Sequence, residues 1–170
     1  MIRKAIWLAL GVLLFASSSF AQSKADVSFG YSYLRLGGSG GVNLQGGEVS
    51  VAGYLNNWFG IAGDFGAYHG SPGGVALNTY TFMGGPRLSA GRNRAISPFV
   101  QVLFGGSHLT ASAGGISGGG TAFSYSAGGG VDLRLMPHLA LRPQVDYLGM
   151  HSHGATLNSA RASVSLVLRF

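Results

Sequence analysis

The chain has 170 residues and a formal net charge of +6, yet only 9% of its residues are charged, whereas an ordinary water-soluble domain carries about 25%. So few charges cannot coat the outside of a soluble domain, and the chain has no basic run of the kind that binds nucleic acid. The 30 glycines alternate with Val, Phe, Tyr and Leu, which excludes a disordered chain because disorder requires low hydrophobicity. We therefore expect an exterior that faces lipid.

The start of the chain has the pattern of a secretory signal peptide. Two basic residues precede an apolar run over residues 5–16, which at about twelve residues is too short for a spanning helix of roughly twenty. Small residues at the peptidase positions predict cleavage between Ala21 and Gln22. Because the chain has no cysteine, the exported protein uses no disulfides. The expected domains are a signal peptide over residues 1–21 and one barrel domain over residues 22–170.

Eight segments of the mature chain alternate apolar and polar residues with a period of two, which predicts β-strands with two different faces. About ten tilted residues, the length of the alternation that ends the chain, suffice for a strand to cross a bilayer. No segment has a helical period. In chain order the expected strands are 26–36, 45–55, 58–68, 78–90, 95–107, 121–135, 139–149 and 159–170.

The connections between these segments alternate in length. Short connections are expected at 56–57, 91–94 and 136–138, and longer ones at 37–44, 69–77, 108–120 and 150–158. An even strand count with this alternation is typical of an outer-membrane barrel with short periplasmic turns and longer outer loops. Pro86 and Pro143 fall inside strands, where we expect a local bulge or bend at each because proline cannot donate to the ladder.

The charged residues indicate which face is the lumen. Every acid shares its strand parity with small or polar neighbours, while the opposite parity is apolar, and a charge in lipid would cost about 2–4 kcal/mol near the midplane. We therefore place ten charged residues inside the barrel: Asp26, Glu48, Asp64, Asp132, Asp146, Arg87, Arg134, Arg142, Arg161 and Arg169. Asp132 is expected to pair with Arg142 across a turn, and Asp26 lies near Arg169 at the closing seam. These are expected to be structural pairs; the alternative is a charged conduction path.

The chain resembles the small outer-membrane β-barrel family, the OmpA/OmpX-like or "outer membrane protein beta-barrel domain" group. The resemblance rests on the signal peptide, the eight strands, the sequences SPFVQVLFGG (97–106) and GGGVDLRL (128–135), and the terminal Phe170. It implies an all-β, eight-stranded antiparallel transmembrane barrel in the outer membrane of a Gram-negative bacterium. It also implies that Phe170 is read by the barrel-assembly machinery. The implied partners are outer-membrane lipid, lipopolysaccharide and periplasmic chaperones, and the barrel is expected to be a monomer without cofactor.

The role expected from these features is structural, in envelope integrity, or interactive at the surface, with no chemistry. A narrow porin-like channel remains an alternative because inward residues such as Gly60, Gly66 and Gly128 could leave a wet lumen. Lipid A deacylases are also eight-stranded barrels, but His151-Ser152 matches their motif only in part, and no acid follows Asp146.

Four histidines are expected at the outer ends of strands or in outer loops, namely His69, His108, His151 and His153. Imidazole is a common metal ligand, so these residues could converge on a metal, or they could be ordinary solvated loop residues. The sequence leaves this open, and we assign no metal, cofactor or catalytic residue.

Overall fold

The structure is a computed structural model that describes residues 24–37, 41–91, 94–114, 116–152 and 155–170. The expected signal peptide and its cleavage site at Ala21 and Gln22 lie outside the described residues. Among the residues that are described, no helix is long and apolar enough to cross a membrane.

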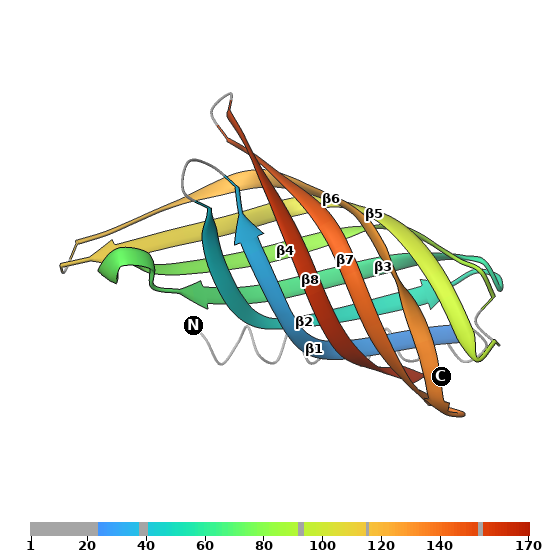
Figure 1. Cartoon of the computed structure of the whole chain (residues 1–170). Coiled ribbons are helices and arrows are strands. Elements are labelled where there is room, and N and C mark those ends of the chain that lie inside the picture. Colours follow the sequence, from blue (N-terminus) through green and yellow to red (C-terminus); the bar gives the residue numbers. More distant parts are fainter. Residues whose placement is uncertain (1–23, 38–40, 92–93, 115, 153–154) are drawn as a thin grey trace, which may run out of the picture.

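Eight antiparallel strands close into a barrel, each hydrogen-bonded to its neighbours in chain order, with β8 pairing back onto β1 (Figure 1). This confirms the predicted fold class. The strands are β1 Lys24–Leu36, β2 Val42–Tyr54, β3 Phe59–Gly70, β4 Ala76–Ser89, β5 Ile96–Ala113, β6 Ile116–Met136, β7 Leu139–Ser152 and β8 Ala155–Arg169. A short 3-10 turn, η1 Pro72–Gly74, lies between β3 and β4.

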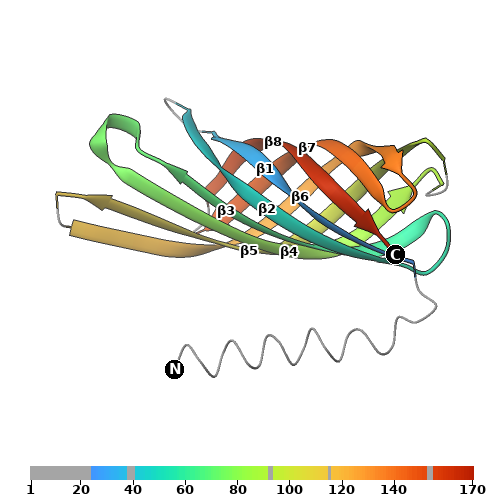
Figure 2. The same cartoon turned by 90° about the horizontal axis from the view of Figure 1, so that it is seen from below.

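The strands are strongly staggered. A circuit through the Cα partners of all eight ladders that leaves β1 at Leu34 returns to β1 at Lys24, ten residues away. A stagger of this kind requires strands tilted against the barrel axis, as the oblique strands in Figure 2 show. Residues that meet inside the lumen therefore come from strands that are distant in sequence.

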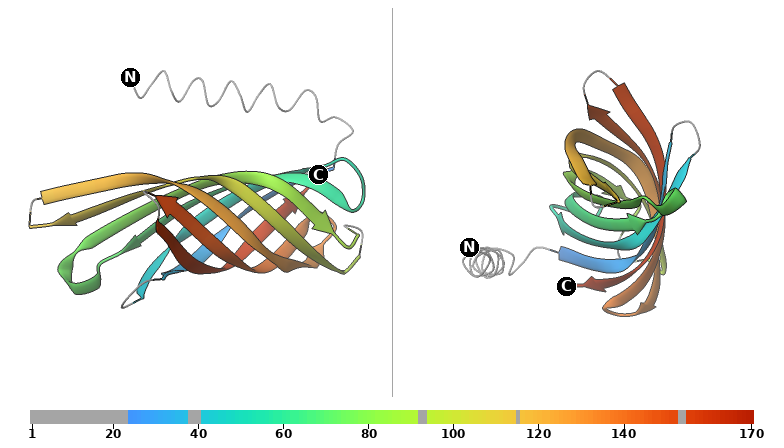
Figure 3. Two further views of the ribbon diagram at one scale, coloured as in Figure 1. Left: turned by 90° about the horizontal axis from the view of Figure 1, so that it is seen from above. Right: turned by 90° about the vertical axis from the view of Figure 1, so that its left-hand side faces the viewer.

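The two ends of the barrel differ. The turn end holds both chain ends of the barrel and the connections 55–58, 90–95 and 137–138, whereas the extended end holds the other four connections. Most of the expected loops 108–120 and 150–158 are strand in the structure, because the ladders continue through their Gly- and Ser-rich sequences. Intrinsic strand preference is weak there, but cross-strand pairing overrides it. The β5–β6 hairpin projects farthest from the barrel (Figure 3, left).

Neither Pro86 nor Pro143 introduces a bulge, which was one of the two alternatives expected there. The register is the same before and after each proline, and the register shift in the β6–β7 ladder lies between Arg134 and Met136. Both prolines are exposed on the outer face of the wall. A missing amide removes a hydrogen bond without adding a residue to the strand, so the register survives.

The wall of the barrel has an apolar outside and a polar inside. Large apolar side chains such as Phe29, Ile61 and Val100 are 48%, 59% and 58% exposed. Serine, threonine and charged side chains of the opposite parity are buried in the lumen. This arrangement inverts that of a soluble protein and suits a lipid environment.

Candidate functional site

The lumen holds most of the charge of the mature chain. All five carboxylates of the sequence are buried there, together with Arg87, Arg142, Arg161 and Arg169. Arg134 is the exception, because it is exposed near the β6–β7 turn and its backbone amide donates to the carbonyl of Ala95 at 2.9 Å. The lumen placement expected for Arg134 is therefore wrong: it has the right parity but lies beyond the enclosed part of the barrel.

One group of charges, which we call the turn-end cluster, consists of Asp26, Asp132, Arg142 and Arg169. Arg142 binds Asp132 in a bidentate manner, with Nε donating to Oδ1 at 2.5 Å and Nη2 donating to Oδ2 at 2.9 Å. Arg169 Nη2 also donates to Asp132 Oδ2, at 2.8 Å, and Arg142 Nη2 lies 3.6 Å from Asp26 Oδ2. The two expected pairs are thus members of one network with two acids and two arginines.

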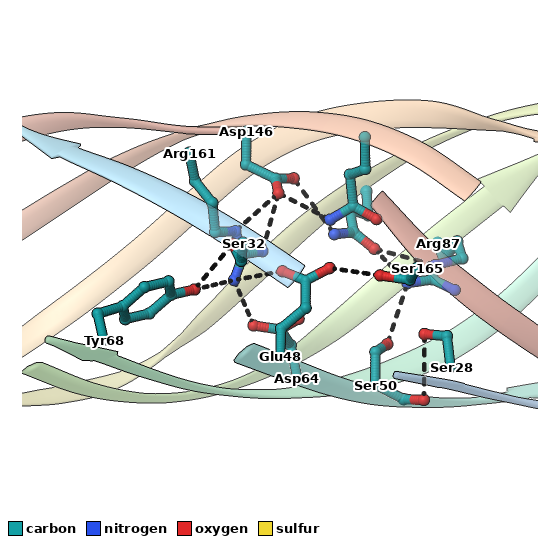
Figure 4. A network of polar contacts seen from close by, with 12 residues as sticks. Ser28, Ser32, Glu48, Ser50, Asp64, Tyr68, Arg87, Asp146, Arg161 and Ser165 are labelled. Carbon is teal, nitrogen blue, oxygen red and sulfur yellow. Dashed lines mark hydrogen bonds and ion pairs between the residues drawn. The ribbon is translucent and has the colours of Figure 1, made fainter. Parts of the chain in front are cut away.

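The second group, the central cluster, has Arg161 at its centre (Figure 4). Its Nη1 donates to Asp64 Oδ1 at 2.6 Å, while its Nη2 and Nε donate to Asp146 Oδ2 at 2.8 and 3.0 Å. Glu48 Oε2 lies 3.6 Å from Nη1, and the hydroxyl of Ser165 donates to Glu48 Oε1 at 3.1 Å. One guanidinium therefore faces three carboxylates from β2, β3 and β7.

Arg87, Gln101 and Phe99 connect the two clusters. Arg87 donates through Nε and Nη2 to Gln101 Oε1 at 2.9 and 2.6 Å, and Gln101 Nε2 donates to Asp146 Oδ1 at 3.3 Å. The ring of Phe99 lies 4.7 Å from the guanidinium of Arg87 and 4.8 Å from that of Arg142, which are favourable cation–π distances. Phe99 and Gln101 were not predicted as site residues from the sequence, although both have lumen parity on β5.

The lumen changes character toward the extended end. Above Arg161 the inward side chains form an apolar layer of Leu34, Leu36, Leu44, Leu148 and Met150, each at most 6% exposed. This layer was not predicted from the sequence, because inward positions were expected to be polar or small throughout. The layer comes from β1, β2 and β7 and adds side chains that cannot coordinate an ion, while the buried hydroxyls of Thr79, Thr81, Ser107 and Ser124 line β4, β5 and β6.

The inward glycines do not leave open space. A Cβ added to Gly66 would lie 2.5 Å from the hydroxyl of Tyr68 and 2.7 Å from Thr81 Oγ1, and one added to Gly128 would overlap the carboxylate of Asp146. These glycines make room for larger neighbours. The premise of a wet lumen, that small residues lie unfilled, is therefore wrong at these positions.

Of the four histidines expected at the outer ends, the three that the structure describes lie on the outer face, and each bonds to its cross-strand partner. The distances from Nδ1 are 2.8 Å to Asn78 Oδ1 for His69, 3.2 Å to Thr121 Oγ1 for His108 and 2.9 Å to Thr156 Oγ1 for His151. They do not converge, and within the part of the chain that the structure describes no three His, Cys, Asp or Glu side chains could hold a metal ion. His153 lies outside that part.

The partial deacylase motif is not assembled either. His151 and Ser152 are successive residues of β7, so their side chains point to opposite faces of the wall. The ring of His151 bonds to Thr156 on the outside, and all acids of the chain are inside the lumen. Among the described residues, His151, Ser152 and an orienting acid therefore do not meet.

Comparison with known proteins agrees with this geometry. Residues 7–170 match the family described as "Outer membrane protein beta-barrel domain". The chain belongs to this family. As a family member with a closed barrel, it is an integral outer-membrane protein. No match was found among curated proteins.

Solved structures of the same fold are similar over most of their length. Neisserial surface protein A (NspA) has a TM-score of 0.74 at 14% identity, over 86% of this chain and 97% of that one. The attachment invasion locus protein Ail of Yersinia pestis has a TM-score of 0.66 at 20% identity, over 87% and 99%. The N-terminal barrel domain of Pseudomonas aeruginosa OprF has a TM-score of 0.59 at 16% identity, over 86% and 100%.

Proposed function

We propose that this protein is a non-conducting outer-membrane barrel without chemistry of its own, and that its role is to present the β5–β6 hairpin as an interaction surface outside the membrane. The observation that carries this proposal is a strand edge for which no ladder partner is found among the described residues. Residues 116–122 of β6 pair with β5, but the β6–β7 ladder begins only at Phe123 and His151. One edge of β6 therefore offers its backbone amides and carbonyls to another chain.

The composition of this edge favours strand addition. An exposed edge is usually protected by charged residues, proline or a bulge, whereas Ile116 to Ala122 contains none of these. An extended peptide that pairs with such an edge gains affinity from main-chain hydrogen bonds. The outer connections carry no Lys, Arg, Asp or Glu, so backbone pairing, rather than charge, would supply the affinity for the partner.

The filled lumen supports the non-conducting part of the proposal. The two ion clusters occupy the turn-end and central parts of the lumen, and the apolar layer lies above them. An ion would have to displace paired charges and then pass leucines that do not hydrate it. In planar bilayers the purified mature protein is expected to give no stable conductance steps, as is a mock preparation from cells that lack the protein. Reproducible steps absent from the mock preparation would support the channel alternative instead.

Strand addition can be tested with displayed peptides. A phage library of random peptides is selected on the detergent-solubilised barrel, and the enriched peptides are tested on a variant in which residues 110–119 are replaced by Asn-Gly. This turn would join Leu109 to Gly120, which are Cα partners. We expect peptides rich in β-branched residues that bind the native barrel and fail to bind the shortened one.

The matched control keeps the edge and changes only side chains. Methyl groups added at Gly118 and Gly120 would meet nothing within 4 Å, so the Gly118→Ala, Gly120→Ala variant should bind the same peptides. Equal binding to the shortened barrel, or no enrichment at all, would contradict strand addition.

A further inference from the structure

Four basic or titratable side chains lie on the outer face of the wall near the extended end. They are Arg35 on β1, His69 on β3, His108 on β5 and His151 on β7, and all four are exposed. Each of the four strands that run from the turn end to the extended end carries one of them. We call this set the basic girdle.

The ladder register places the girdle residues at one level. His69 and His108 pair with Asn78 and Tyr80, two residues apart on β4, and His108 and His151 pair with Thr121 and Phe123, two residues apart on β6. The same offset holds across β2, where Arg35 pairs with Asn43 and His69 with Gln45. The ten-residue stagger of an eight-stranded barrel requires an offset of about two to three residues for every two strands at constant height. The girdle is therefore a row around the barrel.

Aromatic side chains border this row on its turn-end side. Tyr33 precedes Arg35 on the same face of β1, Tyr80 lies directly across from His108, and Phe123 lies directly across from His151. Tyr80 and Phe123 are 44% and 56% exposed. Amphipathic aromatic rings, tyrosine above all, mark the boundary between the apolar core of a membrane and its head groups. The girdle thus lies at head-group level.

No carboxylate of an acidic side chain lies beside the basic girdle. All five carboxylates of the chain are buried in the lumen. The groups beside the girdle on the neighbouring strands are neutral amides and hydroxyls and the phenols of tyrosines: Asn43, Gln45, Asn78, Thr110, Thr121, Thr156, Tyr31, Tyr33 and Tyr80. Because each histidine engages its neighbour through Nδ1, its Nε2 remains for a group outside the protein.

We propose that the basic girdle binds the phosphate groups of anionic lipid head groups, and that its three histidines strengthen this binding as the pH falls. Histidine is the side chain whose charge ordinarily changes between about pH 5 and 8, whereas arginine side chains in general keep their charge over this range. A lipid, rather than a soluble anion, is the expected ligand because the girdle borders an apolar surface that acyl chains cover. Each positive charge near an anionic membrane surface should favour binding by about fivefold.

The test measures which lipid occupies the barrel surface. The mature protein is refolded into phosphatidylcholine vesicles that contain spin-labelled phosphatidylglycerol or spin-labelled phosphatidylcholine, and the motionally restricted fraction gives their relative association constant. The charge of phosphatidylglycerol is constant between about pH 5.5 and 7.5, so a pH effect in this range reports on the protein. We expect the preference for phosphatidylglycerol to rise at least about fivefold on acidification.

Variants separate the girdle from general charge effects. The triple variant His69→Gln, His108→Gln, His151→Gln should lose the rise and keep only the pH-independent preference, and Arg35→Gln should lower the preference at both pH values. His138→Gln is the matched control, since His138 lies at the turn end, where its Nδ1 is 3.0 Å from the backbone oxygen of Arg169. Heat-modifiable gel mobility shows that each barrel is folded, and the single histidine variants should each remove part of the rise.

Three outcomes would overturn the proposal. The native protein could show the same preference at both pH values, the triple variant could keep the full rise, or the control could lose it as well. A further arm adds inorganic phosphate at the concentration of the lipid phosphate. If that abolishes the preference, the girdle binds a free anion rather than a lipid, and the assignment to lipid is wrong.

Discussion

The turn-end cluster and the central cluster neutralise their buried acids in different ways. In the turn-end cluster two acids share two arginines from β7 and β8, whereas in the central cluster three acids share Arg161 alone. Arg161 also reaches across the lumen, because its contacts with Asp64 and Glu48 join β8 to β3 and β2, which are not its neighbours in the wall. If one arginine is removed, the turn-end cluster keeps a second one, whereas the central cluster keeps none. We therefore expect the barrel to depend most on Arg161.

The largest effect is expected for Arg161→Met. Removing the guanidinium would leave three carboxylates buried without a counter-charge, and breaking a buried ion pair typically costs about 3–5 kcal/mol. We expect a loss of unfolding free energy of about 5 kcal/mol, the upper end of this range, measured by urea titration in phosphatidylcholine vesicles. Arg161→Lys, which keeps the charge but not the planar fork, should lose less. A cost below about 1 kcal/mol for Arg161→Met would show that the cluster is hydrated rather than buried.

An intermediate effect is expected for Asp132→Asn. This change leaves Arg142 and Arg169 facing each other with Asp26 as the remaining acid of the cluster, so we expect a cost of about 3 kcal/mol. Arg142→Met should cost less, since Arg169 still holds Asp132 at 2.8 Å. The double variant should recover part of the loss, which a double-mutant cycle measures as coupling. Strictly additive costs would refute the pairing.

The smallest effect is expected for Glu48→Gln. Its carboxylate lies 3.6 Å from Arg161, farther than Asp64 and Asp146 at 2.6 and 2.8 Å. Removing one of three negative charges relieves repulsion and offsets the weak attraction that is lost, so the stability should change by less than about 1 kcal/mol. Asp64→Asn is the comparison, and it should cost clearly more in the same titration. Equal costs would mean that the three acids share Arg161 evenly.

Much of the fold follows from the sequence because a barrel wall repeats one simple rule. Alternation along each strand sets the face of every side chain, and so the eight strands and the inward direction of all five acids could be predicted. The ends of the β5–β6 and β7–β8 hairpins could not, since Gly- and Ser-rich segments have little strand preference of their own. Their pairing depends on the partner strand.

Less of the candidate site than of the fold could be predicted from the sequence. Asp132 and Arg142 could be paired because a short turn fixes their register, whereas the contact of Arg161 with Asp64 depends on the stagger of the whole barrel. Parity alone placed Arg134 inside, because parity does not tell how far the enclosed lumen extends. In the same way, glycine at Gly66 indicates a missing side chain but does not show which neighbour fills the space.

The two prolines mark the parts of the wall where the backbone hydrogen bonds are expected to open first. The β4–β5 ladder lacks two consecutive Cα pairs, one of them at Pro86, and the β6–β7 ladder lacks two, one of them at Pro143. The β1–β8 ladder runs without a gap from Asp26 to Leu36. In lipid no water replaces a missing amide donor, so the backbone next to each proline is held by fewer bonds. Amide hydrogens there should exchange with deuterium sooner than those along the β1–β8 ladder. The β1–β8 ladder is thus expected to open less often than the ladders beside the two prolines.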